Sequence, residues 1–585
     1  MDGQNSFVPS NIDHFFERAF LQMNLNNPEI LTYMGFFEQA GIKNHNGYLQ
    51  ESPSDRHEEL LKLSNEYMLT ALHENRWETL TAEQKISRNV LKWTIENSNR
   101  TLRSHIYPMT QLDGAHTLFI MLMSYFAVIQ NDSDVELYLN RLELAKMKFG
   151  LIALDIQKKR ELGIMPPKIC LEKVIRSMEG IIENLKTENN DLIAAVVQKY
   201  KAATGTDLPK QTVESIQAKI EQYVIPGYEG ALTEIKKCIP HSTDDCGLWK
   251  LPRGEEFYRH CLKWQTSTDH TPQEVHDLGL RHCKNLLDRF QNVVKLLNDK
   301  GDMTLNANLS TEENLKILGE NEKFLYEDSD ESKDTCIKEY ENLLLGISER
   351  VKDMFNIVPS SQCIIKPMPN AMGEGGAGAC YFPGSLDLTR PGIFFVNLAN
   401  IKAQNKSQMK TLTAHEAVPG HHFQISIQLE NKRLPYFRRC CEDERFTAYI
   451  EGWGLYSEYI GKETGFYNED DGSDGYSVLG YYCTELFRAT RLVVDTGLHA
   501  LRWTREQGIE LMIRNTGMSR KEAEDEIDRY CVLPAQACSY KIGQLKLLEI
   551  RKKLEENPDF DIKHFHDTVL NIGAVPLDIL EDIML

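Results

Sequence analysis

The chain has 585 residues, of which 41% are hydrophobic and 26% are charged, as in an ordinary soluble globular protein. At roughly 100–200 residues per domain, this length allows about three to five domains, or fewer large ones. The 86 acidic side chains outnumber the 66 basic ones, and the formal net charge is −20. Because such a charge repels polyanions, we expect no nucleic-acid partner.

The cysteines and the apolar segments indicate a cellular compartment. Thirteen cysteines are present, an odd number, and no two form a C-x-x-C pair, which argues against a disulfide framework. The first twenty residues carry Asp2, Asp13 and Glu17 and no apolar core, so they do not resemble a signal peptide. The longest apolar run, Leu118 to Ile129, has twelve residues. A bilayer span needs roughly 17–25, so we expect a buried helix there, a cytoplasmic protein and no membrane partner.

Helical periodicity dominates the first two-thirds of the chain. Apolar residues recur at i, i+3 and i+4 in five ranges, namely 56–98, 134–163, 172–202, 211–223 and 272–297. The charged stretch from Glu327 to Asp334 predicts a loop or the solvated start of a helix. We therefore assign residues 1–355 to a helical N-terminal portion.

The pattern changes near residue 356. Residues 361–368 and 393–398 predict short strands on either side of a glycine-rich segment. Gly373, Gly375 and Gly378 match G-x-G-x-x-G, but no helix-forming sequence follows them, so we expect a loop or hairpin there and no nucleotide site. Helical patterns resume after Leu398. Residues 356–585 are thus predicted to form a second, mainly α portion with a small β element.

Residues 415–422 read His-Glu-Ala-Val-Pro-Gly-His-His. In zinc peptidases two imidazoles bind the metal, and the glutamate beside the first histidine takes a proton from the water molecule on the metal. This pattern predicts His415 as a zinc ligand and Glu416 as the general base.

The second ligand is either His421 or His422. Position i+4 from His415 is Pro419, which cannot bind a metal and interrupts a helix. On an unbroken helix His421 would point about 240° away from His415, and His422 would lie ~10.5 Å along the axis. A bulge at Pro419 and the next residue would bring His421 to the usual place of a second ligand. We favour His421 and keep His422 as the alternative.

A catalytic zinc site takes three protein ligands and leaves one position open. Residues 444–461 carry apolar side chains at helical spacing, interrupted by Glu451 and Glu458. A buried carboxylate is costly unless it is paired or bound to a metal. We expect Glu451, which follows His415 by 36 residues, to be the third ligand. A salt bridge to an arginine such as Arg445 is the alternative for Glu451 and the favoured interpretation for Glu458.

Two further segments carry polar side chains suited to hydrolysis. Arg491, Asp495 and His499 follow one another at i, i+4 and i+8 and so share one helix face. Asp495 can fix the tautomer of His499, whose other nitrogen can donate to an oxyanion; a salt-bridge ladder is an equal alternative. In residues 534–546, Tyr540 can donate to the same oxyanion, although aromatic side chains more often belong to a core.

Together these segments resemble the DUF885 family, an uncharacterised family grouped with zincin-type metallopeptidases. The resemblance covers most of the chain, is strongest from about residue 245 to 550, and is carried by these segments: GLWKLPRGEEFYRHCLKWQTSTDHTPQEVHDLGL (247–280), YFPGSLDLTRPGIFFVNL (381–398), HEAVPGHHFQ (415–424), EGWGLYSE (451–458), RLVVDTGLHALRW (491–503) and SYKIGQLK (539–546).

The resemblance implies a mainly α, large helical zincin-like fold, with a small β element beside the metal-binding helices and a deep channel walled by residues 1–355. It also implies that residues 356–585 are the catalytic portion and that His415, His421 and Glu451 bind Zn²⁺ with Glu416 as the base. Tyr540 and His499 match motif residues that have no firmly assigned role.

We therefore expect a zinc-dependent metallopeptidase that hydrolyses short peptides. The alternatives are a zinc-dependent amidase or deacylase acting on small non-peptide amides, and a non-catalytic helical binding protein stabilised by a metal. Lys541, Arg491 or Arg488 can bind a substrate carboxylate, and the sequence does not rank them. It also leaves open exo- or endo-action and the oligomeric state.

Overall fold

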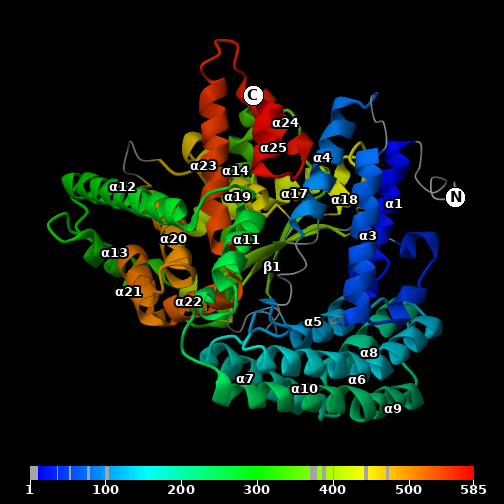
Figure 1. The fold of residues 1–585 in the computed structure, drawn as a ribbon. Coiled ribbons are helices and arrows are strands. Elements are labelled where there is room, and N and C mark those ends of the chain that lie inside the picture. Colours follow the sequence, from blue (N-terminus) through cyan, green and yellow to red (C-terminus); the bar gives the residue numbers. More distant parts are fainter. Residues whose placement is uncertain are drawn as a thin grey trace. The chain divides into compact units, whose positions relative to one another are not determined.

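The computed structural model, shown in Figure 1, describes residues 11–35, 37–51, 54–74, 79–98, 105–112, 114–368, 378–384, 386, 390–399, 401–440, 446–468 and 474–585. The chain divides into two compact units. Unit 1 comprises Met1–Asp245 with Pro435–Phe437, and unit 2 comprises Cys246–Leu434 with Arg438–Leu585.

This division differs from the predicted change at residue 356. Helices α11 (Gly254–Thr266) and α12 (Pro272–Asp299) precede that point, yet α11 packs on α23 (Gln536–Leu554) and α12 on α20 (Gly475–His499). The change near residue 356 marks where the strands begin within unit 2.

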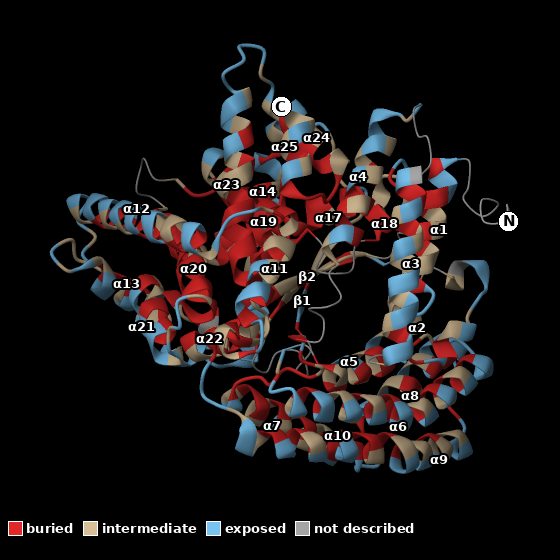
Figure 2. Cartoon of the chain, in the orientation of Figure 1, coloured by how far each residue is buried: buried red, intermediate tan, exposed pale blue. Residues whose placement is uncertain are grey.

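Every regular element of unit 1 among the described residues is a helix. Its α-helices are α1 (Ile12–Asn24), α2 (Pro28–Met34), α3 (Asp55–Glu74), α4 (Ala82–Asn97), α5 (Ala115–Met121), α6 (Asp132–Glu161), α7 (Lys168–Leu185), α8 (Asp191–Thr204), α9 (Lys210–Lys219) and α10 (Ile225–Cys238). The predicted range 172–202 is interrupted before α8, where the Asn190 side chain accepts the Ile193 N–H as an N-cap. Red, buried faces line the contact of α6 with α10 in Figure 2. The run predicted to be a buried helix forms the end of α5 and a π-helical turn at Leu122–Phe126. It is buried only on one side: Phe119 and Met123 are buried, whereas Leu118 and Tyr125 are exposed.

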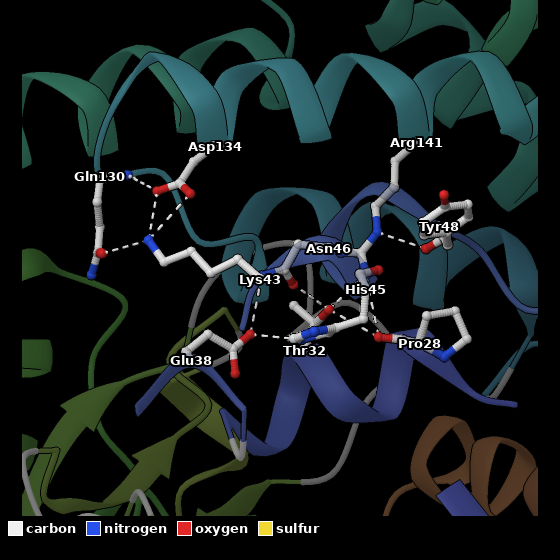
Figure 3. A network of polar contacts seen from close by, with 10 residues as sticks. All are labelled: Pro28, Thr32, Glu38, Lys43, His45, Asn46, Tyr48, Gln130, Asp134 and Arg141. Carbon is white, nitrogen blue, oxygen red and sulfur yellow. Dashed lines mark hydrogen bonds and ion pairs between the residues drawn. The ribbon is translucent and has the colours of Figure 1, made fainter. Parts of the chain in front are cut away.

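Buried polar contacts fasten the N-terminal segment of unit 1 to α6 (Figure 3). The guanidinium of Arg141, only 1% exposed, donates to the Tyr48 carbonyl oxygen at 2.9 Å and to Thr32 Oγ1 at 2.6 Å. Lys43 Nζ pairs with Asp134 at 3.1 Å. Because a buried charge must be hydrogen-bonded or paired, this network fixes the path of the chain before α3.

Unit 2 surrounds the residues that carry the sequence motifs. Besides α11, α12, α20 and α23, its helices are α13 (Thr311–Glu320), α14 (Asp330–Arg350), α16 (Met409–Glu416), α17 (His421–Glu430), α19 (Thr447–Glu463), α21 (Arg505–Thr516), α22 (Arg520–Val532), α24 (Ile562–Ile572) and α25 (Leu577–Met584), while the short α18 (Tyr436–Arg439) holds residues of both units. The charged stretch at 327–334 leads into α14, which begins at Asp330 and is capped by Ser329. No helix among the described residues has the length and apolarity to cross a membrane.

A small three-stranded sheet lies in unit 2. Strands β1 (Cys363–Pro367) and β3 (Gly392–Val396) are parallel, β2 (Ala379–Phe382) is antiparallel to β3, and the order is β1-β3-β2. The two predicted strands are thus confirmed. The glycine-rich segment ends in a third strand that begins just after Gly378, whereas Gly373 and Gly375 lie outside the described residues. The chain is therefore mainly helical with a small β element, and α16 packs on β2.

Helices α19 and α23 pack at backbone distance. A Cβ atom on Gly452 would lie 2.5 Å from Gly543 Cα, and one on Gly543 would lie 1.8 Å from the Ala448 carbonyl oxygen. A larger side chain at either position would push the helices apart. This close approach sets α23 beside the helix that carries Glu451.

Candidate metal centre

The two predicted metal histidines belong to two separate short helices. Helix α16 ends at Glu416, directly after His415, and α17 begins at His421. Residues 417–420 between them leave the helical conformation, as expected where a proline removes a backbone donor. The irregularity predicted at Pro419 is therefore a complete helix break, which frees His421 from the i+6 direction.

Two contacts hold this break in place. A Cβ atom on Gly420 would lie 1.8 Å from the His415 carbonyl oxygen, so only glycine fits where the chain turns back on α16. The indole Nε1 of Trp453, on α19, donates to the Pro419 carbonyl oxygen at 2.8 Å. The loop is thereby tied to the helix that also carries Glu451.

His415, His421 and Glu451 converge. Glu451 Oε2 lies 3.5 Å from His415 Nε2 and 3.3 Å from His421 Nε2, and the three candidate ligand atoms lie within 4.8 Å of one another. Two ligands about 2.05 Å from a tetrahedral zinc ion lie about 3.3 Å apart, so both separations fit a shared ion. Glu451 Oε2 is buried and accepts no hydrogen bond from the described residues. Two imidazoles and one carboxylate are also a donor set of catalytic zinc sites.

Gly454 makes room for both imidazoles on the surface of α19. A Cβ atom at this position would lie 2.9 Å from His415 Nε2 and 3.1 Å from His421 Cε1. Since both rings rest directly on the backbone of the helix that carries Glu451, the absence of a side chain at Gly454 permits the three-residue cluster.

Glu458 orients His415. Its Oε1 lies 2.8 Å from His415 Nδ1, and its Oε2 accepts the Thr484 hydroxyl at 2.7 Å. The carboxylate is only 1% exposed. A carboxylate on one ring nitrogen fixes the tautomer and leaves the other nitrogen for a metal. The predicted salt bridge of Glu458 to an arginine is thus corrected to a pair with His415; Arg445 lies outside the described residues.

The charges of this cluster favour a cation. Burial alone would lower the pKa of His415, but the adjacent Glu451 and Glu458 raise it to about 10. Burial alone would raise the pKa of Glu451, but the facing imidazoles hold it well below its usual range. The negative charges of Glu451 and Glu458 thus stabilise a positive charge here, carried either by protonated His415 or by a bound cation that replaces the proton.

His422 lies against the sheet. Its Nδ1 lies 3.0 Å from the Tyr381 hydroxyl on β2 and 3.3 Å from Ser426 Oγ. Burial lowers the pKa of His422 to about 4, so the ring is neutral near pH 7. Of the two candidate second ligands, the structure therefore places His421 in the cluster.

Glu416 ends α16 one residue after His415. It is 7% exposed, and no described residue forms a hydrogen bond or ion pair with its carboxylate. Burial raises the pKa of Cys363 on β1 and of Cys380 on β2 to about 12, and the charge of Glu416 contributes to both increases. The Glu416 carboxylate is thus close enough to β1 and β2 for its charge to act there, and no described partner prevents it from accepting a proton.

Tyr540 is also brought to the cluster. Its ring stacks on the His415 ring with centroids 6.3 Å apart and planes at 22°. The close packing of α19 and α23 accounts for this placement. The hydroxyl accepts a long hydrogen bond, 3.4 Å, from Gln536 Nε2.

The structure corrects the prediction that His499 donates to an oxyanion. Its Nδ1 accepts the Leu248 N–H at 3.2 Å, and its Nε2 lies 3.0 Å from the Tyr530 carbonyl oxygen. Asp495 accepts the Tyr258 hydroxyl and the Ala535 N–H in place of His499. Both ring nitrogens are therefore engaged by the backbone, and His499 joins segments of unit 2.

The sequence did not predict that Glu458 would orient His415, that Gly454 would make room for the imidazoles, or that Trp453 would hold the loop at Pro419. The spacing held a partial signal, because Glu451, Gly454 and Glu458 follow one another at i, i+3 and i+7 and so share one face of α19.

Comparisons with known proteins agree with this architecture. A solved structure described as a "putative lipoprotein" from Colwellia psychrerythraea is 26% identical, with a TM-score of 0.88 over 98% of this chain and 97% of that one. A "putative lipoprotein of unknown function" from Shewanella oneidensis, 17% identical, has the same fold, with a TM-score of 0.72 over 98% of both chains. No curated protein matches the chain. The family model described as "Bacterial protein of unknown function (DUF885)" matches residues 28–584, and the chain belongs to this family.

Proposed function

We propose that the protein is a zinc-dependent metallopeptidase acting on short peptides. The observation that carries the proposal is the convergence of His415, His421 and Glu451: Glu451 Oε2 lies from both imidazoles at separations that suit one tetrahedral ion, and Glu416 follows His415 directly. The zincin-like fold with a deep channel and the cytoplasmic location belong to the same proposal; recovery of the protein in the membrane fraction of cells would contradict the location.

Each residue of the cluster has a distinct part in the proposed reaction. His415, His421 and Glu451 would hold the zinc ion, which polarises a carbonyl group and makes water acidic when bound. Glu416 accepts a proton from the attacking water and passes it to the amine as the C–N bond breaks. Tyr540 donates a hydrogen bond from its hydroxyl to the oxygen on which negative charge develops. Glu458 holds His415 in the tautomer whose Nε2 is free to bind the ion.

The test combines metal content with cleavage of a mixed peptide library. We expect about one zinc ion per chain, and a Glu416→Gln variant that keeps the zinc but cleaves about 10²–10⁴-fold more slowly. Glu549→Gln is the matched control, because Glu549 lies 49% exposed on α23 and pairs with Lys546 and Lys553.

Three outcomes would contradict the proposal. Wild-type cleavage by zinc-loaded Glu416→Gln would exclude Glu416 as the base. Failure of the wild-type chain to retain zinc would exclude the metal site. Cleavage of acylated small amides, with no cleavage of peptides, would replace the peptidase by an amidase.

A further inference from the structure

Three arginines gather next to Tyr540 in unit 2. The guanidinium carbons of Arg488 and Arg491, both on α20, lie 4.9 and 4.8 Å from the centroid of the Tyr540 ring. Arg529, on α22, donates to Gln536 Oε1 at 3.0 Å, and Gln536 in turn contacts the Tyr540 hydroxyl. A cationic cluster therefore lies one aromatic ring away from the candidate metal ligand His415.

The positive charge of this cluster is incompletely compensated. Glu526 Oε2 lies 2.9 Å from Arg491 Nη2, and Glu526 Oε1 lies 4.0 Å from Arg529 Nη1. Arg488 forms no ion pair with any described residue. Two buried guanidinium nitrogens, Arg488 Nε and Arg491 Nη1, also have no hydrogen-bond partner among the described residues. Buried donors without partners are costly, and these two indicate a place for an anionic ligand.

The three basic residues that the sequence left unranked can now be distinguished. Lys541 is 3% exposed, and its ammonium group is already engaged by Glu485 and by Gln544. Arg491 is held by Glu526 and by the Tyr530 hydroxyl, and its Nη1 is the nitrogen without a hydrogen-bond partner among the described residues. Arg488 is half-buried. Its charge is therefore available to a ligand that enters the site.

The electrostatic surroundings of Arg488 agree with this placement. Burial lowers the pKa of its guanidinium, the charge of Arg491 lowers it further, and the negative charges of Glu458 and Glu451 oppose these effects. The charges of Tyr540, Glu458 and Glu451 thus all favour the protonated form of Arg488. An arginine remains protonated in proteins, so the group presents a full positive charge there.

The separation from the metal cluster suits a short piece of peptide. The two contacts that link Arg488 to His415 through Tyr540 are 4.9 and 6.3 Å long. An extended chain advances about 3.3–3.6 Å per residue. A peptide whose scissile carbonyl lies at the metal cluster would thus bring a group at most about three residues further along to Arg488.

We propose that Arg488, with Arg491 Nη1, binds the C-terminal carboxylate of the substrate, so that the protein removes one to three residues from the carboxyl end of short peptides. This inference rests on the proposed peptidase function. Guanidinium groups bind carboxylates through paired N–H donors, and such charge-assisted bonds are the strong ones. A carboxylate on a terminal Asp or Glu side chain has the same chemistry, so the test separates the two sources.

The experiment compares three forms of one peptide: the free acid, the C-terminal amide, and the amide with a terminal glutamate. Binding is measured by calorimetry with zinc-loaded Glu416→Gln, and cleavage by mass spectrometry with the wild type. We expect the free acid to bind about 10- to 100-fold more tightly than either amide, and cleavage to release short C-terminal fragments.

The variants assign the preference to Arg488. Arg488→Ala should remove the difference between acid and amide, Arg488→Lys should retain part of it, and Arg520→Ala should leave it unchanged. Arg520 is a matched control, since it lies 56% exposed on α22 and pairs with Glu506. Zinc content and circular dichroism identify any variant that fails to fold, and Arg488→Lys then serves as the test.

The outcomes separate this inference from the proposed function. Equal binding of acid and amide by the parent protein would overturn the inference, although peptide cleavage would still support the peptidase. Equally tight binding of the glutamate amide would overturn the assignment to the terminal carboxylate. A preference for the acid that survives in Arg488→Ala would exclude Arg488. Absence of peptide cleavage by zinc-loaded protein would refute the proposed function, while the binding comparison would still report on Arg488.

Discussion

Glu458→Gln tests whether the second carboxylate of α19 orients a metal ligand. The substitution keeps the side-chain shape and an oxygen that can accept from His415 Nδ1, but it removes a negative charge 2.8 Å from the ring. Loss of such a partner typically lowers metal affinity 10–100-fold, which corresponds to about 1.4–2.8 kcal/mol. The bond from Thr484 to the side chain can persist, so we expect weaker zinc binding in a folded protein.

The assay is competition for zinc against a coloured chelator near neutral pH. Glu463→Gln is the control on the same helix, since Glu463 pairs with Arg551 at 2.7 Å at the end of α19. Unchanged zinc affinity in Glu458→Gln would refute the orienting part of Glu458. A loss as large as that of His415→Ala would show that Glu458 acts as a ligand.

Three further predictions concern Gly454 and two buried histidines. Gly454→Ala should lower zinc affinity at least about tenfold in the same competition, because its Cβ would lie 2.9 Å from His415; wild-type affinity would show that the rings can move aside. Burial alone would lower the pKa of His415, but Glu451 and Glu458 raise it to about 10 in the metal-free protein. The protonated ring therefore stabilises the fold fully below pH 6.5, and this stabilisation is lost as the pH rises toward 10. Urea unfolding after chelation should therefore show a decreasing free energy over that window, and a rise would contradict it. Burial lowers the pKa of His116 to about 4, so protonation of this residue destabilises unit 1 as the pH falls from 6.5 toward 4. His116→Leu should therefore lose less stability than the wild type over this pH range. An equal fall of the urea midpoint in both proteins would contradict this prediction.

Much of the helical fold could be predicted from periodicity, because the apolar residues on the buried face of an amphipathic helix recur in the sequence with a period of about 3.6 residues. The unit boundary at Asp245 could not, since α11 and α12 look like the helices before them but pack on α23 and α20. These contacts join helices that are far apart in the sequence, and the local apolar pattern does not predict which distant helix each one packs on.

The site was partly predictable for a related reason. Pro419 forces a helix break, and this local fact was enough to favour His421 over His422. The partners of Glu458 and His499 were not predictable, because a buried carboxylate can be satisfied by an arginine or an imidazole. His499 is held by the Leu248 N–H and the Tyr530 carbonyl oxygen. Almost every residue carries these backbone groups, so the sequence does not show which of them pair with His499.

The break between α16 and α17 also changes what the proposed zinc ion does for the chain. It joins three helices, and its outermost ligands, His415 and Glu451, stand 36 residues apart. A disulfide that closes a loop of this size removes about 3–4 kcal/mol of unfolded-chain entropy. No disulfide joins two of the described cysteines. The ion would thus act as a removable cross-link, so that the supply of zinc sets the rigidity of unit 2.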